Sequence, residues 1–227
     1  MKTIKYIAGA LIAILLIITT VVLFNTLKSV PTYESTKKID IKSIDHQGAV
    51  NRFAKSLMFK TIANYDDFPK SEYKRFHRFL ENSFPLVHST LKKEIVGGYS
   101  LLYTWKGTDS SKKPILFMGH QDVVPIAPGT LGLWTHPPFD GKAVDGFIWG
   151  RGAIDNKSGV MGIFEAVETL ISDGFTPKQT IYLSFGHDEE IGGNEGAAKT
   201  VELLKSRGVK LDYVLDEGGI ITNGMFP

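Results

Sequence analysis

The sequence contains no cysteine and has no strong excess of charge of either sign. Without cysteine there is neither a disulfide framework nor a thiolate metal site, so any metal must be held by His, Asp and Glu. The 26 basic and 24 acidic residues leave a formal net charge of +2. Lys and Arg do not cluster among the aromatic residues, so we expect no nucleic-acid partner. The 227 residues suffice for one domain with a sizeable core.

A long uncharged stretch occurs near the N-terminus, where Lys2 and Lys5 precede an apolar run over residues 6–24. Its length is close to the ~20 residues that a helix needs to cross a bilayer. The alternative is a cleaved signal peptide, but its apolar core is usually only ~7–15 residues, and no small-residue cleavage site follows Phe24. We therefore expect a single-pass membrane protein whose main domain is extracytoplasmic or lumenal. The expected parts are a cytoplasmic stub at 1–5, a transmembrane anchor at 6–24, a linker at 25–45 and a folded domain at 46–227.

The sequence pattern of residues 46–227 predicts helices and strands in alternation. Apolar residues recur at helical spacing over 46–60, 71–83, 158–171 and 194–206. Short β-prone runs predict strands at 100–105, 114–118, 147–149, 180–185 and 213–215, with a hairpin turn at Asp145-Gly146. From residue 114 onward, strands alternate with helices. That order predicts an α/β fold with a mainly parallel sheet flanked by helices.

Residues that can bind metal directly follow four of these predicted strands. Each group alone has an ordinary explanation, such as a helix cap or a solvated turn. Together they predict a metal centre, because parallel strands bring their carboxyl ends to one edge and converging carboxylates repel unless cations lie between them. Ligands without sulfur suit zinc, manganese or cobalt, and this many favour a pair of ions sharing a bridging carboxylate. The groups are His120-Gln121-Asp122, Asp155-Asn156, Asp188-Glu189-Glu190 and Asp216-Glu217.

The same segments form four ordered motifs that resemble those of the M20 metallopeptidase family. Within that family the sequence is most similar to the carboxypeptidase S branch, which includes the N-fatty-acyl-amino-acid hydrolases/synthases. The apolar N-terminus and the Pro-Pro-Phe of 134–141 also fit that branch. The resemblance implies a two-zinc exopeptidase-like catalytic domain from roughly residue 46 onward. The motifs are Gly119 to Pro125, Gly150 to Lys157, Gly186 to Glu190 and Leu215 to Gly219.

The resemblance implies a metal-binding role for a residue in each motif. His120 would bind the first zinc and Asp155 would bridge both ions, with a peptide bond to Asn156 that is often cis in the family. Glu190 would bind the second zinc. Asp216 would complete the first, with Glu217 as the rival for that role.

Two further residues receive catalytic roles from the resemblance. Asp122 would accept the second ring N–H of His120 and so fix the orientation of the imidazole. Glu189 would be the general base that takes a proton from the attacking water and returns it to the leaving nitrogen. The implied reaction is zinc-dependent hydrolysis of an amide or peptide bond next to a free carboxylate, in a peptide or an N-acyl amino acid.

Some neighbouring polar residues receive structural interpretations. We expect His187 to support the site without binding metal, and Lys157 and Arg151 to anchor local carboxylates. Ser158 is expected to cap the following helix. His136 is a weaker candidate for substrate contact.

The resemblance also implies segments that the sequence does not contain. Family members are about twice as long and carry an inserted lid and dimerisation domain, then a return to the sheet that supplies the last zinc-binding His. We therefore expect an N-terminal part of such a protein, inactive by itself and able to form a homodimer only through the missing lid. An alternative is a membrane-tethered remnant that binds only metal or a partner chain. A single-metal deacetylase fits Asp155 and the Glu189-Glu190 pair less well.

Overall fold

The computed structural model describes residues 2–28, 45–64 and 67–218. Contacts divide the chain into two units, Met1–Lys42 and Ser43–Pro227. The first contains the helix α1 (Lys2–Lys28), whose stretch Ile4–Lys28 has a mean hydropathy of 2.9. At 1.5 Å per residue this helix is about 40 Å long, which exceeds the ~30 Å hydrocarbon thickness of a bilayer. It is thus long and apolar enough to cross a membrane.

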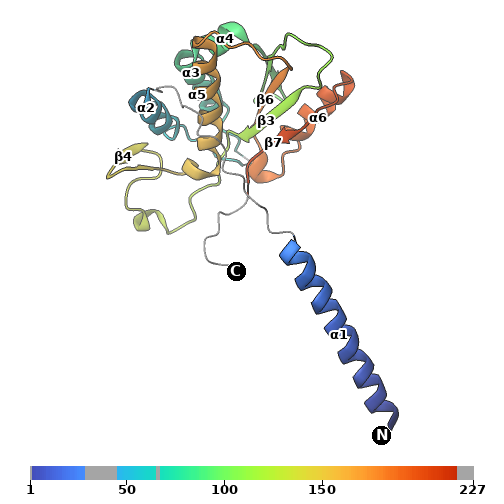
Figure 1. Ribbon diagram of the computed structural model, residues 1–227. Coiled ribbons are helices and arrows are strands. Elements are labelled where there is room, and N and C mark those ends of the chain that lie inside the picture. Colours follow the sequence, from blue (N-terminus) through green and yellow to red (C-terminus); the bar gives the residue numbers. More distant parts are fainter. Residues whose placement is uncertain (1, 29–44, 65–66, 219–227) are drawn as a thin grey trace. The chain divides into compact units, whose positions relative to one another are not determined.

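The second unit is built on a mixed five-stranded sheet in the order β1-β2-β6-β3-β7 (Figure 1). β3 lies parallel to both β6 and β7, whereas β2 pairs antiparallel with β1 and with β6. The parallel strands end at the same edge, where their following loops meet. The strands are β1 (Lys92–Val96), β2 (Ser100–Trp105), β3 (Ile115–His120), β6 (Ile181–Gly186) and β7 (Val214–Leu215).

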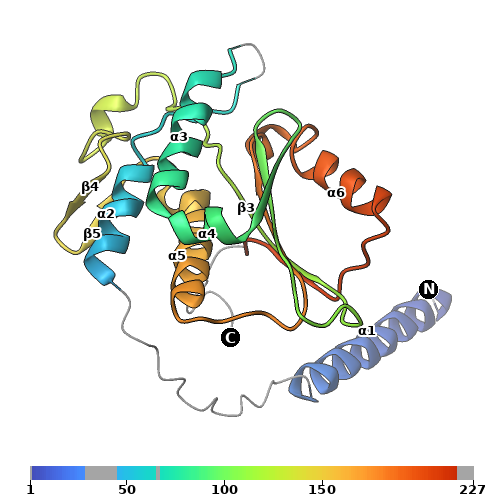
Figure 2. The same cartoon turned by 90° about the horizontal axis from the view of Figure 1, so that it is seen from above.

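Helices cover both faces of this sheet (Figure 2). One face carries α2 (His46–Ser56), α3 (Lys70–Ser83), α4 (Pro85–Thr90) and α5 (Ser158–Ser172), and the other carries α6 (Ala197–Ser206). The remaining elements are a short hairpin and single turns that connect the layers. They are η1 (Leu131–Leu133), β4 (Lys142–Val144), β5 (Phe147–Trp149), η2 (Ala153–Lys157) and η3 (Glu189–Ile191).

The two faces bury cores of different size. Under α3, α4 and α5, the fully buried Phe164 stacks between Phe84 and Phe185, with both pairs of ring centroids 5.0 Å apart. Burying such aromatic side chains is a main source of stability, at roughly 25 cal/mol per Å² of apolar surface. Under α6 a smaller cluster joins Leu204 to Leu102 and Leu116 of the sheet. The larger core therefore supports the helix α5, which follows the candidate site residue Asp155.

The turn between β1 and β2 requires glycine at one position. Gly97 and Gly98 both have positive φ, at 57° and 96°. A Cβ added at Gly97 would lie 1.7 Å from the carbonyl oxygen of Glu195, so no other residue fits without moving that backbone. The turn between β4 and β5 also has positive φ at Asp145 and Gly146, as a two-residue hairpin requires.

The structure corrects the sequence prediction in two places. The sheet is mixed rather than mainly parallel, because the tight Gly97-Gly98 turn forces β1 and β2 into an antiparallel hairpin. The strand predicted at 147–149 is present as β5, but it pairs with β4 outside the five-stranded sheet. Asp155 therefore comes from η2 and not from the end of a strand in the main sheet.

Element boundaries differ modestly from the sequence prediction. The helix predicted at 46–60 ends at Ser56, and α4 and β1 were not predicted. The strand β1 lies at the sheet edge and buries only Val96, so its sequence KKEIV is mostly charged. A charged run of this kind does not show the apolar pattern from which a strand is predicted. Residues 25–28 of the predicted linker belong to α1, and its residues 29–44 lie outside the described part of the chain.

Candidate metal centre

His120 lies at the carboxyl end of β3 with only 2% of its surface exposed. Its Nδ1 faces Asp122, 3.1 Å from the backbone oxygen and 3.3 Å from the carboxylate Oδ1. Its Nε2 faces the opposite way, 2.9 Å from Asp155 Oδ1. The imidazole is therefore fixed on one side by the chain and turned on the other toward the open edge of the sheet.

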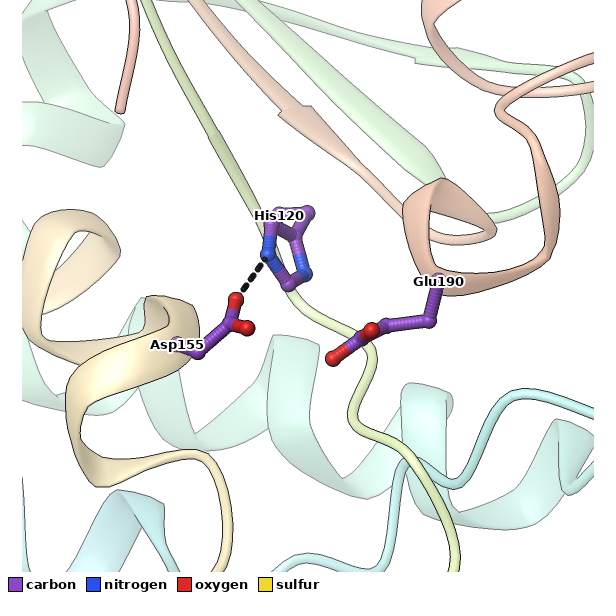
Figure 3. Close-up of side chains that lie close together, drawn as sticks. All are labelled: His120, Asp155 and Glu190. Carbon is purple, nitrogen blue, oxygen red and sulfur yellow. Dashed lines mark hydrogen bonds and ion pairs between the residues drawn. The ribbon is translucent and has the colours of Figure 1, made fainter. Parts of the chain in front are cut away.

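Acidic side chains from three loops surround the Nε2 of His120. Figure 3 shows the carboxylates of Asp155 and Glu190 turned toward the imidazole, from η2 and η3 respectively. Ligand atoms of these three residues all lie within 4.8 Å of one another. A second such group joins His120 to Glu189 and Glu217, whose Oε2 atoms are 3.8 and 3.5 Å from Nε2. The two groups overlap at the His120 imidazole, so together they place four acids around one ring nitrogen.

The fully buried Asp122 joins the two main loops of the site. Besides approaching His120, its Oδ2 accepts a 2.9 Å hydrogen bond from the backbone N–H of Glu190. Asp122 thus contacts the imidazole after β3 mainly through its backbone oxygen, and its carboxylate positions the loop that follows β6. The sequence resemblance gave the ring N–H to the carboxylate; in the structure the carboxylate Oδ1 lies 3.3 Å from Nδ1 but makes no hydrogen bond among the described residues.

The acid that follows β7 and approaches the imidazole is Glu217. Its Oε2 accepts a 2.5 Å hydrogen bond from Asn156 Nδ2, which directs the side chain toward His120. Asp216 lines the same pocket, but among the described residues it belongs to neither candidate ligand group. Its Oδ1 accepts from the Glu217 backbone N–H at 2.9 Å. The geometry therefore favours Glu217 in the place that the sequence gave to Asp216.

The site concentrates negative charge around a single imidazole. Burial raises the pKa of both Glu189 and Glu190, and neighbouring carboxylates add to the effect. Burial alone would lower the pKa of His120, but the Asp122 carboxylate and then those of its neighbours raise it to about 9. Without a cation, the groups of this cluster bind their protons more tightly than ordinary Glu and His side chains do. Its oxygen and nitrogen donors fit a divalent metal such as zinc.

Several neighbouring residues differ from their expected roles. Lys157 is fully buried and donates to the carbonyls of Ser56 and Phe59, at 3.1 and 2.8 Å, rather than to a carboxylate. The Arg151 guanidinium lies over the Trp134 ring, 5.3 Å from its centroid. Both therefore anchor loops by contacts other than the carboxylate pairs that the sequence predicted.

Further expectations concern one hydroxyl group, two imidazole groups and a peptide bond. The Ser158 hydroxyl donates to the carbonyl of Ile154 at 3.0 Å instead of capping α5. His187 is buried, with its Nδ1 2.6 Å from Ser100 Oγ, and belongs to neither candidate ligand group. His136 contacts the Trp149 ring, 5.1 Å between centroids. The peptide bond between Asp155 and Asn156 is cis, as the resemblance implied.

Sequence reasoning gave no role to Gln121, His77 and Asn156, although all three support the site through hydrogen bonds. Asn156 holds Glu217, and His77 bonds to Gln121, which lies between His120 and Asp122. The one available signal was position, because Gln121 and Asn156 each adjoin a predicted ligand.

The arrangement agrees with what is found on comparison with known proteins. Residues 116–225 match the model of the family described as peptidase family M20/M25/M40. This segment is a peptidase M20 domain. The similarity to known proteins extends over most of the chain. The chain is 42% identical over 222 residues to a probable carboxypeptidase S-like protein of Dictyostelium discoideum, covering 91% of this chain and 42% of that protein.

Two other curated relatives are similar to this chain at comparable identity. An N-fatty-acyl-amino acid synthase/hydrolase of Danio rerio is 40% identical over 239 residues, covering 99% of this chain and 46% of that protein. Carboxypeptidase S of Saccharomyces cerevisiae is 46% identical over 147 residues, covering 64% and 25%. The chain therefore spans less than half the length of these relatives.

Solved structures support the fold of the M20 domain. An M20 family metallo-carboxypeptidase from Sulfolobus solfataricus superposes with a TM-score of 0.61 at 22% identity, over 75% of this chain and 37% of that one. Human carnosine dipeptidase 1 gives a TM-score of 0.62 at 22% identity, over 77% and 39%. At this identity the likeness establishes the mixed α/β fold.

Proposed function

We propose that the protein takes part in zinc-dependent hydrolysis of an amide or peptide bond next to a free carboxylate. The observation that carries this proposal is the convergence of Asp155, Glu189 and Glu190 on His120 at one edge of the sheet. The names of the relatives favour peptides or N-acyl amino acids as substrates. The activity belongs to the complete gene product, since the chain spans less than half of those relatives.

Two zinc ions would be held by His120, Asp155, Glu190 and an acid after β7. Asp155 would be the ligand between the two ions, because it lies against His120 Nε2 and shares a candidate group with Glu190. For the acid after β7, we prefer Glu217 to Asp216 because the hydrogen bond from Asn156 directs Glu217 to the imidazole. Bound ions of this kind supply a water nucleophile at neutral pH and polarise the scissile carbonyl.

Glu189 is the proton carrier of the reaction. Its side chain is half exposed and borders the pocket between β3 and β6, so a substrate can reach it. Burial raises the pKa of its carboxyl toward neutral pH. A group whose pKa lies near the working pH can both accept and return a proton. Its Oε2 takes the proton of the attacking water and delivers it to the leaving nitrogen.

The apolar helix α1 is proposed as a membrane anchor, with residues 6–24 in the bilayer and the M20 domain on the extracytoplasmic or lumenal side. Lys2 and Lys5 favour retention of the N-terminus in the cytoplasm. The tests are extraction at alkaline pH, protease protection of the M20 domain, and sequencing of the mature N-terminus. Release at alkaline pH, or a mature N-terminus beyond α1, contradicts the anchor.

The decisive experiment compares Glu189→Gln with the wild-type complete gene product on N-acyl amino acids and short peptides. Loss of the proton carrier should lower kcat by about 10²–10⁴-fold while bound zinc, measured by metal analysis, is retained. Glu195→Gln is the matched control, because Glu195 is an exposed acid a few positions along the same loop. A chelator should abolish wild-type activity.

The outcomes distinguish a zinc-dependent hydrolase from a remnant that only binds metal. Full activity of Glu189→Gln, or wild-type activity that resists chelation, refutes the assignment. A complete gene product that binds zinc but cleaves neither substrate class supports a metal-binding remnant instead.

A further inference from the structure

The side chain of Gln121 is fully buried between the two residues that form the fixed side of the site, His120 and Asp122. Successive side chains of an extended chain point in opposite directions, so Gln121 points away from the pocket into the protein. There its Nε2 donates to the carbonyl oxygens of Phe185 at 2.8 Å and Tyr99 at 3.1 Å. A buried amide needs such partners, because a polar group buried without one loses the hydrogen bonds that it makes with water.

The other end of the amide is held by His77 from α3. The ring Nε2 of His77 lies 2.8 Å from Gln121 Oε1, and the two residues are 44 positions apart in sequence. Since the amide nitrogen faces carbonyl oxygens, the amide oxygen must face His77, which therefore carries its proton on Nε2. His77 is itself buried, and burial lowers its pKa, so the ring stays neutral. This bond fixes which way the Gln121 amide faces.

These contacts join the ends of the two strands that lead into the metal centre. Gln121 follows β3, and its side chain bonds the carbonyl of Phe185 in β6. Its backbone N–H also donates to Gly186 at the end of β6, at 2.8 Å. The strand ends in turn lead to His120 and to Glu190. The Gln121 amide thus adds a side-chain bond behind the site, at the point where the ladder that pairs His120 with Gly186 ends.

We propose that Gln121 and His77 are positioning residues that set the distance between His120 and the η3 carboxylates for metal binding. This inference rests on the proposed metal site and extends it to a helix, α3, that contributes no candidate ligand. It assigns the buried histidine of α3 a role beyond filling the core.

The proposal makes the chemistry of each group important, not only its volume. In Gln121→Glu a carboxylate oxygen would face the carbonyl oxygens of Phe185 and Tyr99 and push the strand ends apart. In His77→Leu the amide oxygen of Gln121 loses its donor. In His77→Gln a side-chain amide can place an N–H near the position of the ring Nε2 and keep the bond.

The experiment titrates the full 227-residue chain, solubilised in detergent, with Co²⁺, whose visible absorption reports coordination geometry. The control is His88→Leu. His88 is a part-buried histidine of α4 that bonds Tyr103 Oη at 2.9 Å on the same face of the sheet, but it has no contact with the site. Thermal unfolding of the metal-free proteins measures the stability loss of each variant separately.

We expect His77→Leu and Gln121→Glu to lower Co²⁺ affinity by about 10-fold or more and to shift the absorption bands. His77→Gln should keep affinity close to wild type. His88→Leu should unfold at a lower temperature with an unchanged spectrum and affinity. If His77→Leu does not fold, His77→Asn, whose amide is too short to reach Gln121 Oε1, carries the same expectation.

Different results overturn different claims. Wild-type affinity and spectrum in His77→Leu and Gln121→Glu refute the positioning role and leave the metal site standing. Equal loss of affinity in His88→Leu refutes it too, because the effect would then follow general stability. A wild-type chain that binds no Co²⁺ refutes the metal site and this inference with it.

Discussion

The two sides of the candidate metal centre differ in how they are built. On the imidazole side, His120 is 2% exposed and Asp122 fully buried, and hydrogen bonds hold both in place. On the carboxylate side, the side chains of Asp155, Glu189 and Glu217 are 65%, 50% and 32% exposed. Folding alone therefore fixes the imidazole. The carboxylates, which repel one another, depend on a cation to hold them together.

The largest expected effect comes from removing a ligand on the exposed side. Glu217→Gln should lower zinc affinity by more than the ~10–100-fold that loss of a ligand's hydrogen-bond partner costs. Asp216→Asn is the matched control and should change affinity little, because Asn can still accept the Glu217 N–H through its Oδ1. Competition with a coloured chelator measures both. The reverse order of effects would restore Asp216 as the ligand.

The buried imidazole side is tested with Asp122→Asn, which keeps the size of the side chain but leaves it a single acceptor oxygen. Asp122 accepts the Glu190 N–H with one carboxylate oxygen and places the other 3.3 Å from His120 Nδ1, so an amide would turn an N–H toward one of these two donors. We expect zinc affinity to fall by about 10–100-fold. Isothermal titration calorimetry measures the change. Asp109→Asn, on an exposed loop, should have no effect, and unchanged affinity in Asp122→Asn would show that the imidazole needs no such partner.

The response of zinc affinity to pH is a smaller expected effect, and it tests the same comparison between the buried imidazole and the exposed carboxylates. Because its carboxylate neighbours raise the pKa of His120 to about 9, metal must displace a proton at neutral pH. Zinc affinity should then rise by about tenfold per pH unit between pH 7 and 8, with proton release detectable in buffers of different ionisation enthalpy. A binding constant independent of pH would contradict the raised pKa.

The raised pKa of His120 also makes the stability of the metal-free fold fall as the pH rises, whereas zinc affinity rises. The folded protein binds the His120 proton more tightly than the unfolded chain, whose pKa is near 6.5. The stabilisation is therefore complete below pH 6.5 and is lost as the pH rises toward 9. Urea unfolding of metal-free protein at pH 6.5 and 8.5 tests this, with His136→Gln as a variant that should keep the wild-type difference.

Much of the candidate site could be predicted because acidic residues and a histidine follow successive predicted strands. The resemblance to a known family then named His120, Asp155 and Glu190, and the structure brings these three side chains together. The choice between Asp216 and Glu217 could not be made that way. They are adjacent, and the contact that separates their roles comes from Asn156 in another segment.

Long-range pairing also explains what the sequence did not predict of the fold. Nothing near Gln121 indicates that its partner is His77 on α3. Likewise, β2 and β3 follow one another in the chain, but β6 lies between them in the sheet. Local patterns fix the type of an element, whereas its neighbours depend on which apolar surfaces meet in the folded core.

The short strand β7 has a consequence for how the centre assembles. It is two residues long, and its neighbour in the described sheet is β3. Tyr213, Val214 and Leu215 are about half exposed, and Glu217 follows two residues later. Such an edge strand frays more easily than a central one. Glu217 is thus carried by a short, half-exposed strand, and metal binding should hold β7 more firmly on the sheet.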